Sequence, residues 1–476
     1  MIHFLFLLFI LLLLTGCNLP SSGAQQPGEV QLQVPASTLP AVLPGQTIDP
    51  LSLEYLGAFT LPAGGERPRT FEYGGNAMTF DPSGDPSGPQ DGFPGSLFIT
   101  GHDRLPYGDL PDGSQVAEVD IPAPSLDWDV ARLPRAGFLQ DFADVTRAHF
   151  TSMEEIVRTG LLYLDTPQTG PRIHIVWGQH IEPDPTAPTV GWFSPDLSAP
   201  EFAGEWFLEG QSWYNANDYL FEIPSAWAQA YAGGRVIAAG RFKDGGWSGM
   251  GPALIAYRPW LEDGAAPAGR ASLGTTVLLR YADSTQTEVI ERSLSGYQHP
   301  DEWNGGAWLT GPSGASAVLF AGTKSNGDKY WYGYLNPGGA GLPCVDTDVT
   351  DFVTCRLRDG TPCPAQDFLG CRGHNDYRGW WSTHWDSQFL FYDPADLARV
   401  ARGELGSWQP QPYAVLDIDE YLFFNPSGVE TGMIGTGDQR RYRLGDVAYD
   451  RANGLLYVLE LFADGAAPVV HVWRVP

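Results

Sequence analysis

Short apolar runs separated by clusters of turn-forming residues recur along most of the chain, which predicts β-strands joined by turns. The final stretch shows the pattern clearly: residues 445–449, 455–461 and 469–475 are rich in β-branched and aromatic side chains. Residues 450–454, with the sequence Asp-Arg-Ala-Asn-Gly, are typical of the turn between the first two strands. Because only three strands precede the chain end, we expect a strand from elsewhere to complete a four-stranded sheet.

A candidate for that missing strand lies near the other end of the pattern. Residues 51–60 form an isolated strand signal, with no hairpin partner before Pro68. Pairing this segment with the final stretch would join the two ends and remove an open sheet edge. Such closure is typical of β-propellers, whose blades are four-stranded sheets.

Four further groups of strand signals resemble the C-terminal one. They cover residues 74–142, 154–208, 218–281 and 304–418. Their starts are irregularly spaced and further apart than in the well-known propeller repeats, which indicates long loops. We therefore predict an all-β, five-bladed β-propeller over residues 51–476, with six or seven blades as alternatives.

Composition agrees with this fold and argues against one class of partner. Of the 476 residues, 57 are Gly, 40 are Pro and 13% are aromatic, which favours an all-β protein rich in turns. The formal net charge of −28 argues against a nucleic-acid partner, because phosphate binding requires clustered Lys and Arg.

The N-terminus carries an export signal. An apolar run over residues 4–14 is too short to span a membrane and fits the hydrophobic region of a signal peptide. It ends in Leu14-Thr15-Gly16-Cys17, which resembles the lipobox of bacterial lipoproteins. The resemblance implies that Cys17 is lipidated and that the protein is exported and anchored to the outer face of the cell membrane. Residues 18–50 read as a flexible tether. An ordinary cleaved signal is the alternative.

A cysteine-rich insertion interrupts the fourth group, at about residues 325–386. It contains four cysteines: Cys344, Cys355, Cys363 and Cys371. In an exported chain we expect two disulfides, and three pairings are open. A zinc site is less favoured because the spacing contains no Cys-x-x-Cys. The insertion is also rich in aromatic residues, including Trp380 and Trp381.

The predicted fold brings polar residues together at one end of a central channel. The first strand of each propeller blade lines this channel, so first-strand starts and second-strand ends open on the same face, which we call the mouth. Candidate catalytic residues there are Glu154, Glu155, Asp218 and Asp446. Candidate ligand-binding residues are Asn76, His102, Asp103, His180, Asn217, Arg241, Asn304 and Lys324, together with Trp380 and Trp381 of the insertion. For any single residue a structural role, such as bonding to nearby backbone, is the alternative.

These residues suggest binding of an extracellular ligand, with a carbohydrate favoured. Aromatic rings stack on sugar faces, while carboxylates and amides bond the hydroxyls. The alternative is a glycoside hydrolase with two carboxylates flanking the scissile bond. The predicted layout is similar to the arabinanase/fructosidase group of glycosidases, but Asn76 stands where the resemblance implies an Asp.

A lyase using His102 or His180 as the base, with Arg241 neutralising a uronate, is a third hypothesis. A Ca²⁺ ion in the channel, held by Asp218, Asp446 or Glu154, is compatible with all three. No cofactor is otherwise implied.

Overall fold

The computed structural model describes residues 46–476 except 86–87, 103–114, 147–156, 180–186, 213–214, 245–248, 284–291, 332–344, 347–352, 355–379, 430–436 and 438–439. The predicted signal segment, Cys17 and all but the last residues of the tether therefore lie outside the described residues, and so do Cys344, Cys355, Cys363 and Cys371. Neither of the α-helices in the described part combines the length and the apolar character needed to cross a membrane.

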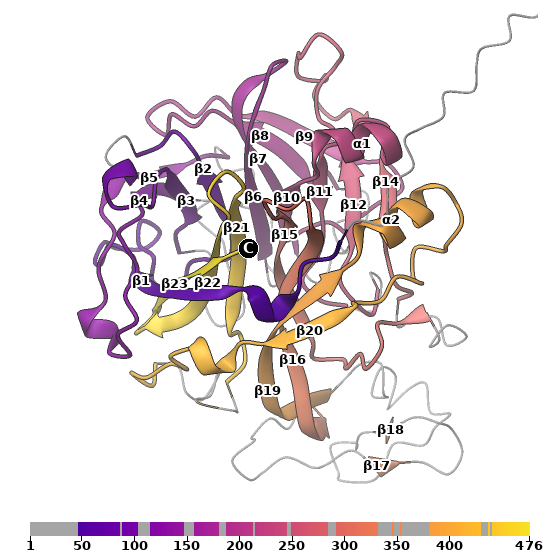
Figure 1. Cartoon of the computed structure of the whole chain (residues 1–476). Coiled ribbons are helices and arrows are strands. Elements are labelled where there is room, and N and C mark those ends of the chain that lie inside the picture. The colour runs from indigo at the N-terminus through magenta and orange to yellow at the C-terminus, as the bar shows by residue number, and fades with distance from the viewer. Residues whose placement is uncertain are drawn as a thin grey trace, which may run out of the picture. The chain divides into compact units, whose positions relative to one another are not determined.

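Five antiparallel sheets form the blades of a propeller, which confirms the predicted fold class (Figure 1). The first blade contains β2 (Met78–Asp81), β3 (Ser96–Thr100), β4 (Gln115–Asp120) and β5 (Phe138–Asp144). The second contains β6 (Val157–Thr166), β7 (Gly170–Gln179), β8 (Val190–Phe193) and β9 (Ala203–Leu208), and β13 (Ser272–Leu273) adds a parallel fifth strand. The third contains β10 (Leu220–Glu222), β11 (Ile237–Ala239), β12 (Leu254–Tyr257) and β14 (Thr276–Leu279).

The fourth and fifth blades complete the ring. The fourth contains β15 (Glu302–Thr310), β16 (Ser316–Trp331), β19 (Trp380–Tyr392) and β20 (Ala414–Asp417). The fifth contains β21 (Leu444–Asp450), β22 (Leu455–Asp464), β23 (Ala467–Arg474) and β1 (Glu54–Thr60). The remaining elements are α1 (Ser225–Tyr231), α2 (Pro394–Ala401), the pair β17 (Val345–Asp346) and β18 (Val353–Thr354), and the 3₁₀ turns η1 (Pro50–Ser52), η2 (Gly88–Gln90), η3 (Val130–Arg132) and η6 (Asp419–Tyr421).

The N-terminal strand closes the propeller as the sequence predicted. β1 pairs antiparallel with β23, from Glu54 opposite Arg474 to Thr60 opposite Val469. The connection between β4 and β5 covers the outer edge of β1, where Ala58 and Ser125 exchange two backbone hydrogen bonds of 2.9 Å. The strand that joins the two ends is therefore itself paired on both sides, which leaves little exposed edge.

The first strands of the five blades line the channel. Each of β2, β6, β10, β15 and β21 contacts the first strands of the two neighbouring blades, so the contacts close into a ring. The backbones approach closely here: a Cβ added at Gly160 would lie 1.9 Å from the carbonyl oxygen of Asp218. Glycine is required at this position because any side chain would collide with the next blade.

The apolar core lies between the blades. The five largest clusters of buried apolar side chains each join two adjacent blades, and together they continue around the ring. One example is the contact of Phe221 in blade 3 with Phe320 in blade 4, whose ring centroids are 6.0 Å apart. Because both faces of these sheets are buried, strands such as β22 read as nearly continuous apolar runs.

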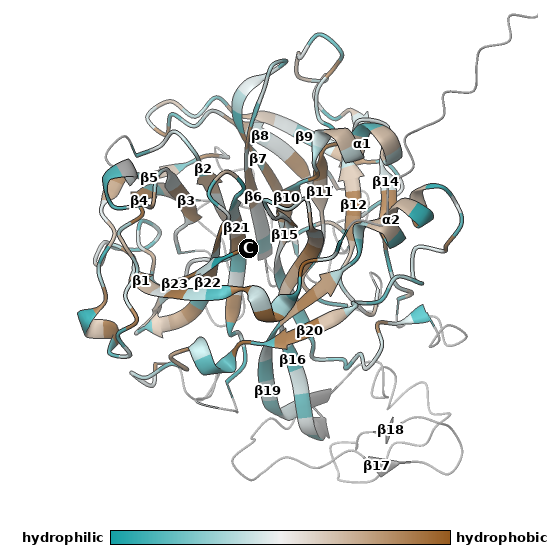
Figure 2. Cartoon of the chain, viewed as in Figure 1, coloured by the Kyte–Doolittle hydropathy of each residue, from teal (hydrophilic) through white to brown (hydrophobic). Residues whose placement is uncertain are grey.

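The fourth blade carries a long hairpin. β16 extends to Trp331 and β19 begins at Trp380. The first and last residues of the insertion predicted at about 325–386 therefore belong to these two strands of the blade. Hydrophilic residues gather on the part of this hairpin that projects from the ring (Figure 2).

Candidate functional site

A buried polar network lies at the mouth, where the first strands begin. Arg158 donates from Nε and Nη2 to the two carboxylate oxygens of Asp218, each at 3.0 Å, and from Nη2 to Oδ1 of Asn304 at 2.9 Å. Asn304 in turn donates from Nδ2 to the carbonyl oxygen of Leu444 at 2.5 Å. The ring of Phe242 lies 4.2 Å from the guanidinium carbon. The network therefore connects blades 2, 3, 4 and 5 across the channel.

Asp446 completes the network from blade 5. Its two carboxylate oxygens accept backbone N–H bonds from Met78 at 3.0 Å and from Val447 at 2.7 Å. Burial raises the pKa of Asp446 well above its ordinary value, and the nearby charge of Asp218 adds to this, while the N–H bonds and Arg158 oppose it. The structure thus brings Asp218 and Asp446 together. Both oxygens of Asp218 bind Arg158 of blade 2, and one oxygen of Asp446 binds Met78 of blade 1.

Beneath this network the channel narrows to a cavity of about 70 Å³, lined by all five first strands. Arg451, at the opposite end, donates from Nη1 to the carbonyl oxygen of Trp308 and to Oγ1 of Thr310, and pairs with Glu222 at 3.3 Å. The channel is therefore bounded by a polar contact between blades at each end.

A second polar group lies at the seam between blades 3 and 4. The ammonium of Lys324 donates to both oxygens of Asp301, at 3.0 and 2.8 Å, and Lys243 pairs with Glu302 at 3.2 Å. Burial raises the pKa of the Asp301 carboxyl, while Lys324 and the backbone N–H groups of Ser325 and Gln298 oppose the rise. Carboxylates and cations are matched one to one in these two pairs.

A crevice of about 70 Å³ opens beside these pairs. Asp301, Lys324 and Gln388 supply its polar lining. Its apolar walls are Leu294, Trp303, Leu390, Pro412 and Val415. One side of the crevice can therefore form hydrogen bonds while the other offers an apolar surface.

Four further predicted residues of this face are buried. His102 is 6% exposed, and its Nδ1 lies 2.9 Å from the carbonyl oxygen of Glu72. Asn217 donates from Nδ2 to the carbonyl oxygen of Gln179 at 3.4 Å. Asn76 is also buried at the start of blade 1. Arg241, at the end of the second strand of blade 3, donates from Nη2 to the carbonyl oxygen of Gly251 at 3.3 Å.

Several predicted residues cannot be placed. Asp103, Glu154, Glu155 and His180 lie outside the described residues. Trp380 and Trp381 belong to β19, but their side chains are not among those described.

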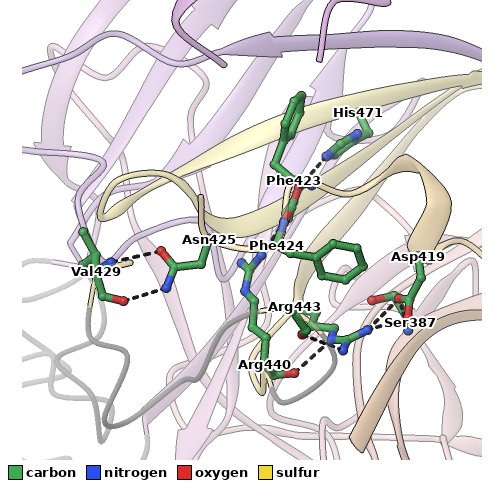
Figure 3. Close-up of polar contacts among 11 residues, drawn as sticks. Ser387, Asp419, Phe423, Phe424, Asn425, Val429, Arg440, Arg443 and His471 are labelled. Atoms are coloured by element: carbon green, nitrogen blue, oxygen red, sulfur yellow. Dashed lines mark hydrogen bonds and ion pairs between the residues drawn. The ribbon is translucent and has the colours of Figure 1, made fainter. Parts of the chain in front are cut away.

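A further polar network, which was not predicted from the sequence, lies at the seam between blades 4 and 5 (Figure 3). Buried Glu460 accepts hydrogen bonds from Nη1 of Arg440 and from the backbone N–H groups of Phe423 and Phe424, and Nε2 of His471 lies 3.0 Å from its Oε2. Burial tends to raise the pKa of Glu460, but Arg440, His471 and the backbone bond lower it to about 2. The other ring nitrogen of His471 lies 3.0 Å from the Tyr55 hydroxyl on β1.

A group of acidic residues at the edge of blade 4 could in principle hold a cation. Carboxylate oxygens of Asp386, Asp417 and Asp419 lie within 4.8 Å of one another. Both oxygens of Asp419, however, already accept from Nη1 of Arg443 at 2.7 Å. This group lies away from the channel residues from which the sequence suggested a Ca²⁺ site.

A larger cleft, of about 250 Å³, lies on the face opposite the mouth, between blades 2 and 3. Its charged lining residues include Arg258 and Glu262, which pair with each other at 2.5 Å, and Glu222, which pairs with Arg451. Leu164, Val236 and the largely buried Trp260 form its apolar wall.

Compared with models of known protein families the chain matches none, and the comparison with curated proteins finds no match either.

Proposed function

We propose that the protein is a surface-anchored lipoprotein that binds an extracellular carbohydrate at the mouth of its propeller. The observation that carries this proposal is the crevice between blades 3 and 4, which sets the Asp301–Lys324 pair against the apolar walls formed by Trp303, Leu294 and Val415. A sugar ring has the same two characters, with hydroxyls at its edge and apolar C–H groups on its faces. A pocket with apolar walls and a few convergent polar groups is the usual form of a small-ligand site.

Binding is favoured over hydrolysis because Asp218 and Asp446, the two candidate catalytic residues that the structure describes, already have their carboxylate oxygens engaged in hydrogen bonds. A glycoside hydrolase needs one carboxyl group free to protonate the leaving group and a second free to act as base or nucleophile. Both oxygens of Asp218 accept from Arg158, and both oxygens of Asp446 accept backbone N–H groups. Recruiting either to catalysis would break a contact that holds neighbouring blades together.

The test is equilibrium binding of the full chain to a panel of soluble oligosaccharides, with analysis of the mixture for cleavage products. Val415, which is 51% exposed, lines the crevice, so Val415→Trp should fill it and weaken binding about tenfold or more. Leu139→Trp introduces the same side chain at a 39% exposed position in blade 1 and should leave the affinity unchanged. Binding by the Val415→Trp variant equal to that of the parent protein, or no bound oligosaccharide at all, would contradict the proposal. Cleavage of the bound oligosaccharide would favour a hydrolase instead.

A further inference from the structure

The crevice at the blade 3–4 seam exists because a glycine lies between two large side chains. Trp303 of β15, Gly322 of β16 and Gln388 of β19 stand opposite one another in register across the three strands. Side chains that stand opposite one another in a sheet project from the same face. Gly322 has no side chain, so a gap remains between Trp303 and Gln388, and all three residues line the crevice. In the next row, the paired residues Leu390 and Val415 add an apolar lining.

The crevice has room for a substituent of a sugar but not for the whole ring. Its volume is about 70 Å³. A cavity of roughly 150 Å³ accommodates one benzene molecule, so the crevice holds a group of roughly three or four heavy atoms. The sugar ring would then lie across the rim, where Val415 is 51% exposed.

Gln388 supplies the polar group of the crevice that is free to bind a ligand. Its side chain is half-buried and forms no hydrogen bond with another described residue, and no atom of its amide is fully enclosed. Asp301, by contrast, already accepts two hydrogen bonds from Lys324 and one each from the backbone N–H groups of Ser325 and Gln298. Lys324, whose side chain is 24% exposed, keeps a third N–H bond, while Asp301 matches its charge.

These groups are complementary to an acetamido group, which has four heavy atoms. Its N–H group can donate to Oε1 of Gln388, and its carbonyl oxygen can accept from Lys324. Its methyl group can pack against the apolar walls, which include Leu294, Leu390 and Pro412. A hydroxymethyl group lacks the apolar end, and an O-acetyl ester lacks the N–H donor. A carboxylate lacks both, and it would meet a cation that Asp301 has already neutralised.

We infer that the carbohydrate bound at the blade 3–4 seam contains N-acetylated amino sugar residues, and that the crevice takes their acetamido group. Gln388 is the residue that determines this specificity. The inference rests on the proposed carbohydrate-binding function and specifies the class of its ligand. It involves no covalent step.

The experiment measures binding of the full chain to three trisaccharides that differ only in the substituent at C2. Tri-N-acetylchitotriose carries acetamido groups, chitotriose carries free amino groups and cellotriose carries hydroxyls. We expect the acetylated sugar to bind about tenfold more tightly than either of the others. Gln388→Met keeps the length of the side chain but removes its amide, so it should weaken binding of the acetylated sugar about tenfold. It should leave the affinity for cellotriose and the Tm unchanged, because the Gln388 amide has no partner to lose among the described residues.

Gln229→Met is the matched control. Gln229 is an exposed residue of α1 that lines the larger cleft on the opposite face, so this variant should bind all three trisaccharides as the parent protein does. Binding of the acetylated sugar no tighter than that of either of the others, or undiminished binding by Gln388→Met, would overturn the acetamido inference and leave the proposed function standing. Failure of the whole oligosaccharide panel to bind would overturn both.

Discussion

Replacing Glu460 by Gln should destabilise the protein in a pH-dependent way. Its carboxylate accepts from Arg440, Phe423 and Phe424 and lies against His471, all at the seam that β1 closes. A glutamine at this position offers one acceptor oxygen and leaves the buried Arg440 guanidinium without its counter-charge. Breaking a buried ion pair in this way costs about 3–5 kcal/mol.

The pKa of Glu460 gives an independent value for the stability that its ionised carboxylate contributes. It falls from 4.5 to about 2 on folding, and a decrease of this size corresponds to about 3 kcal/mol of stability in the ionised state. Because the folded pKa is the lower one, this stability is present above about pH 4.5 and is lost as the pH falls toward 2. The Glu460→Gln variant has no carboxylate at this position and does not lose this stability. The difference in the free energy of unfolding between the parent protein and the variant should therefore shrink as the pH falls.

Urea denaturation followed by tryptophan fluorescence at a series of pH values from 7 to 2.5 measures this difference. Glu54→Gln is the matched control, because Glu54 forms an exposed pair with Arg474 between β1 and β23. An exposed pair contributes about 0–1 kcal/mol, so the control should change little. A Glu460→Gln variant as stable as the parent protein at pH 7, or a difference that does not vary with pH, would refute this reasoning.

Three further predictions concern the buried ion pair in the channel, the close packing of the first strands and the lipid anchor. Arg158→Ala should lower the free energy of unfolding by about 3–5 kcal/mol, because it leaves Asp218 buried without its partner. The double variant Arg158→Met/Asp218→Leu should recover much of this loss. Equal stability of the single variant and the parent protein would contradict a structural role for the pair. Gly160→Ala should lower the free energy of unfolding by about 1–3 kcal/mol or more, because its Cβ would meet the Asp218 carbonyl oxygen. Gly269→Ala should be tolerated, because no atom lies within 4 Å of the Cβ that it adds. Equal Tm values for the two variants would contradict the close packing of the blades. Cys17→Ser should release the protein into the culture medium, and retention of this variant in the membrane fraction would contradict lipid anchoring.

The strand pattern predicts the blades because both faces of each sheet are buried. Residues 445–449, 455–461 and 469–475 correspond closely to β21, β22 and β23, and the isolated segment 51–60 supplies β1. Turn chemistry is equally local: Asp450 accepts from the backbone N–H groups of Ala452 and Asn453, as the Asp and Asn of that turn suggest.

Side-chain partners across the channel are not a local property, which explains what sequence reasoning missed. Asp218 reads as a candidate catalytic residue until Arg158, 60 residues earlier, is seen to bind both its oxygens. A signal for Glu460 does exist, because it is a charged residue in an apolar strand and shares the strand face of the buried Leu456 and Val458. Its partners Arg440 and His471 are buried with it, and only the folded chain brings them together.

Hydrogen exchange of the full chain, with and without a bound oligosaccharide, tests the central claim most directly, because it locates the ligand. We predict protection of backbone amides at the blade 3–4 seam, in segments 294–303 and 413–416, which contain crevice residues such as Trp303 and Val415. Protection confined to the opposite face, around Gln168 and Gln229 of the larger cleft, would contradict a ligand site at the mouth.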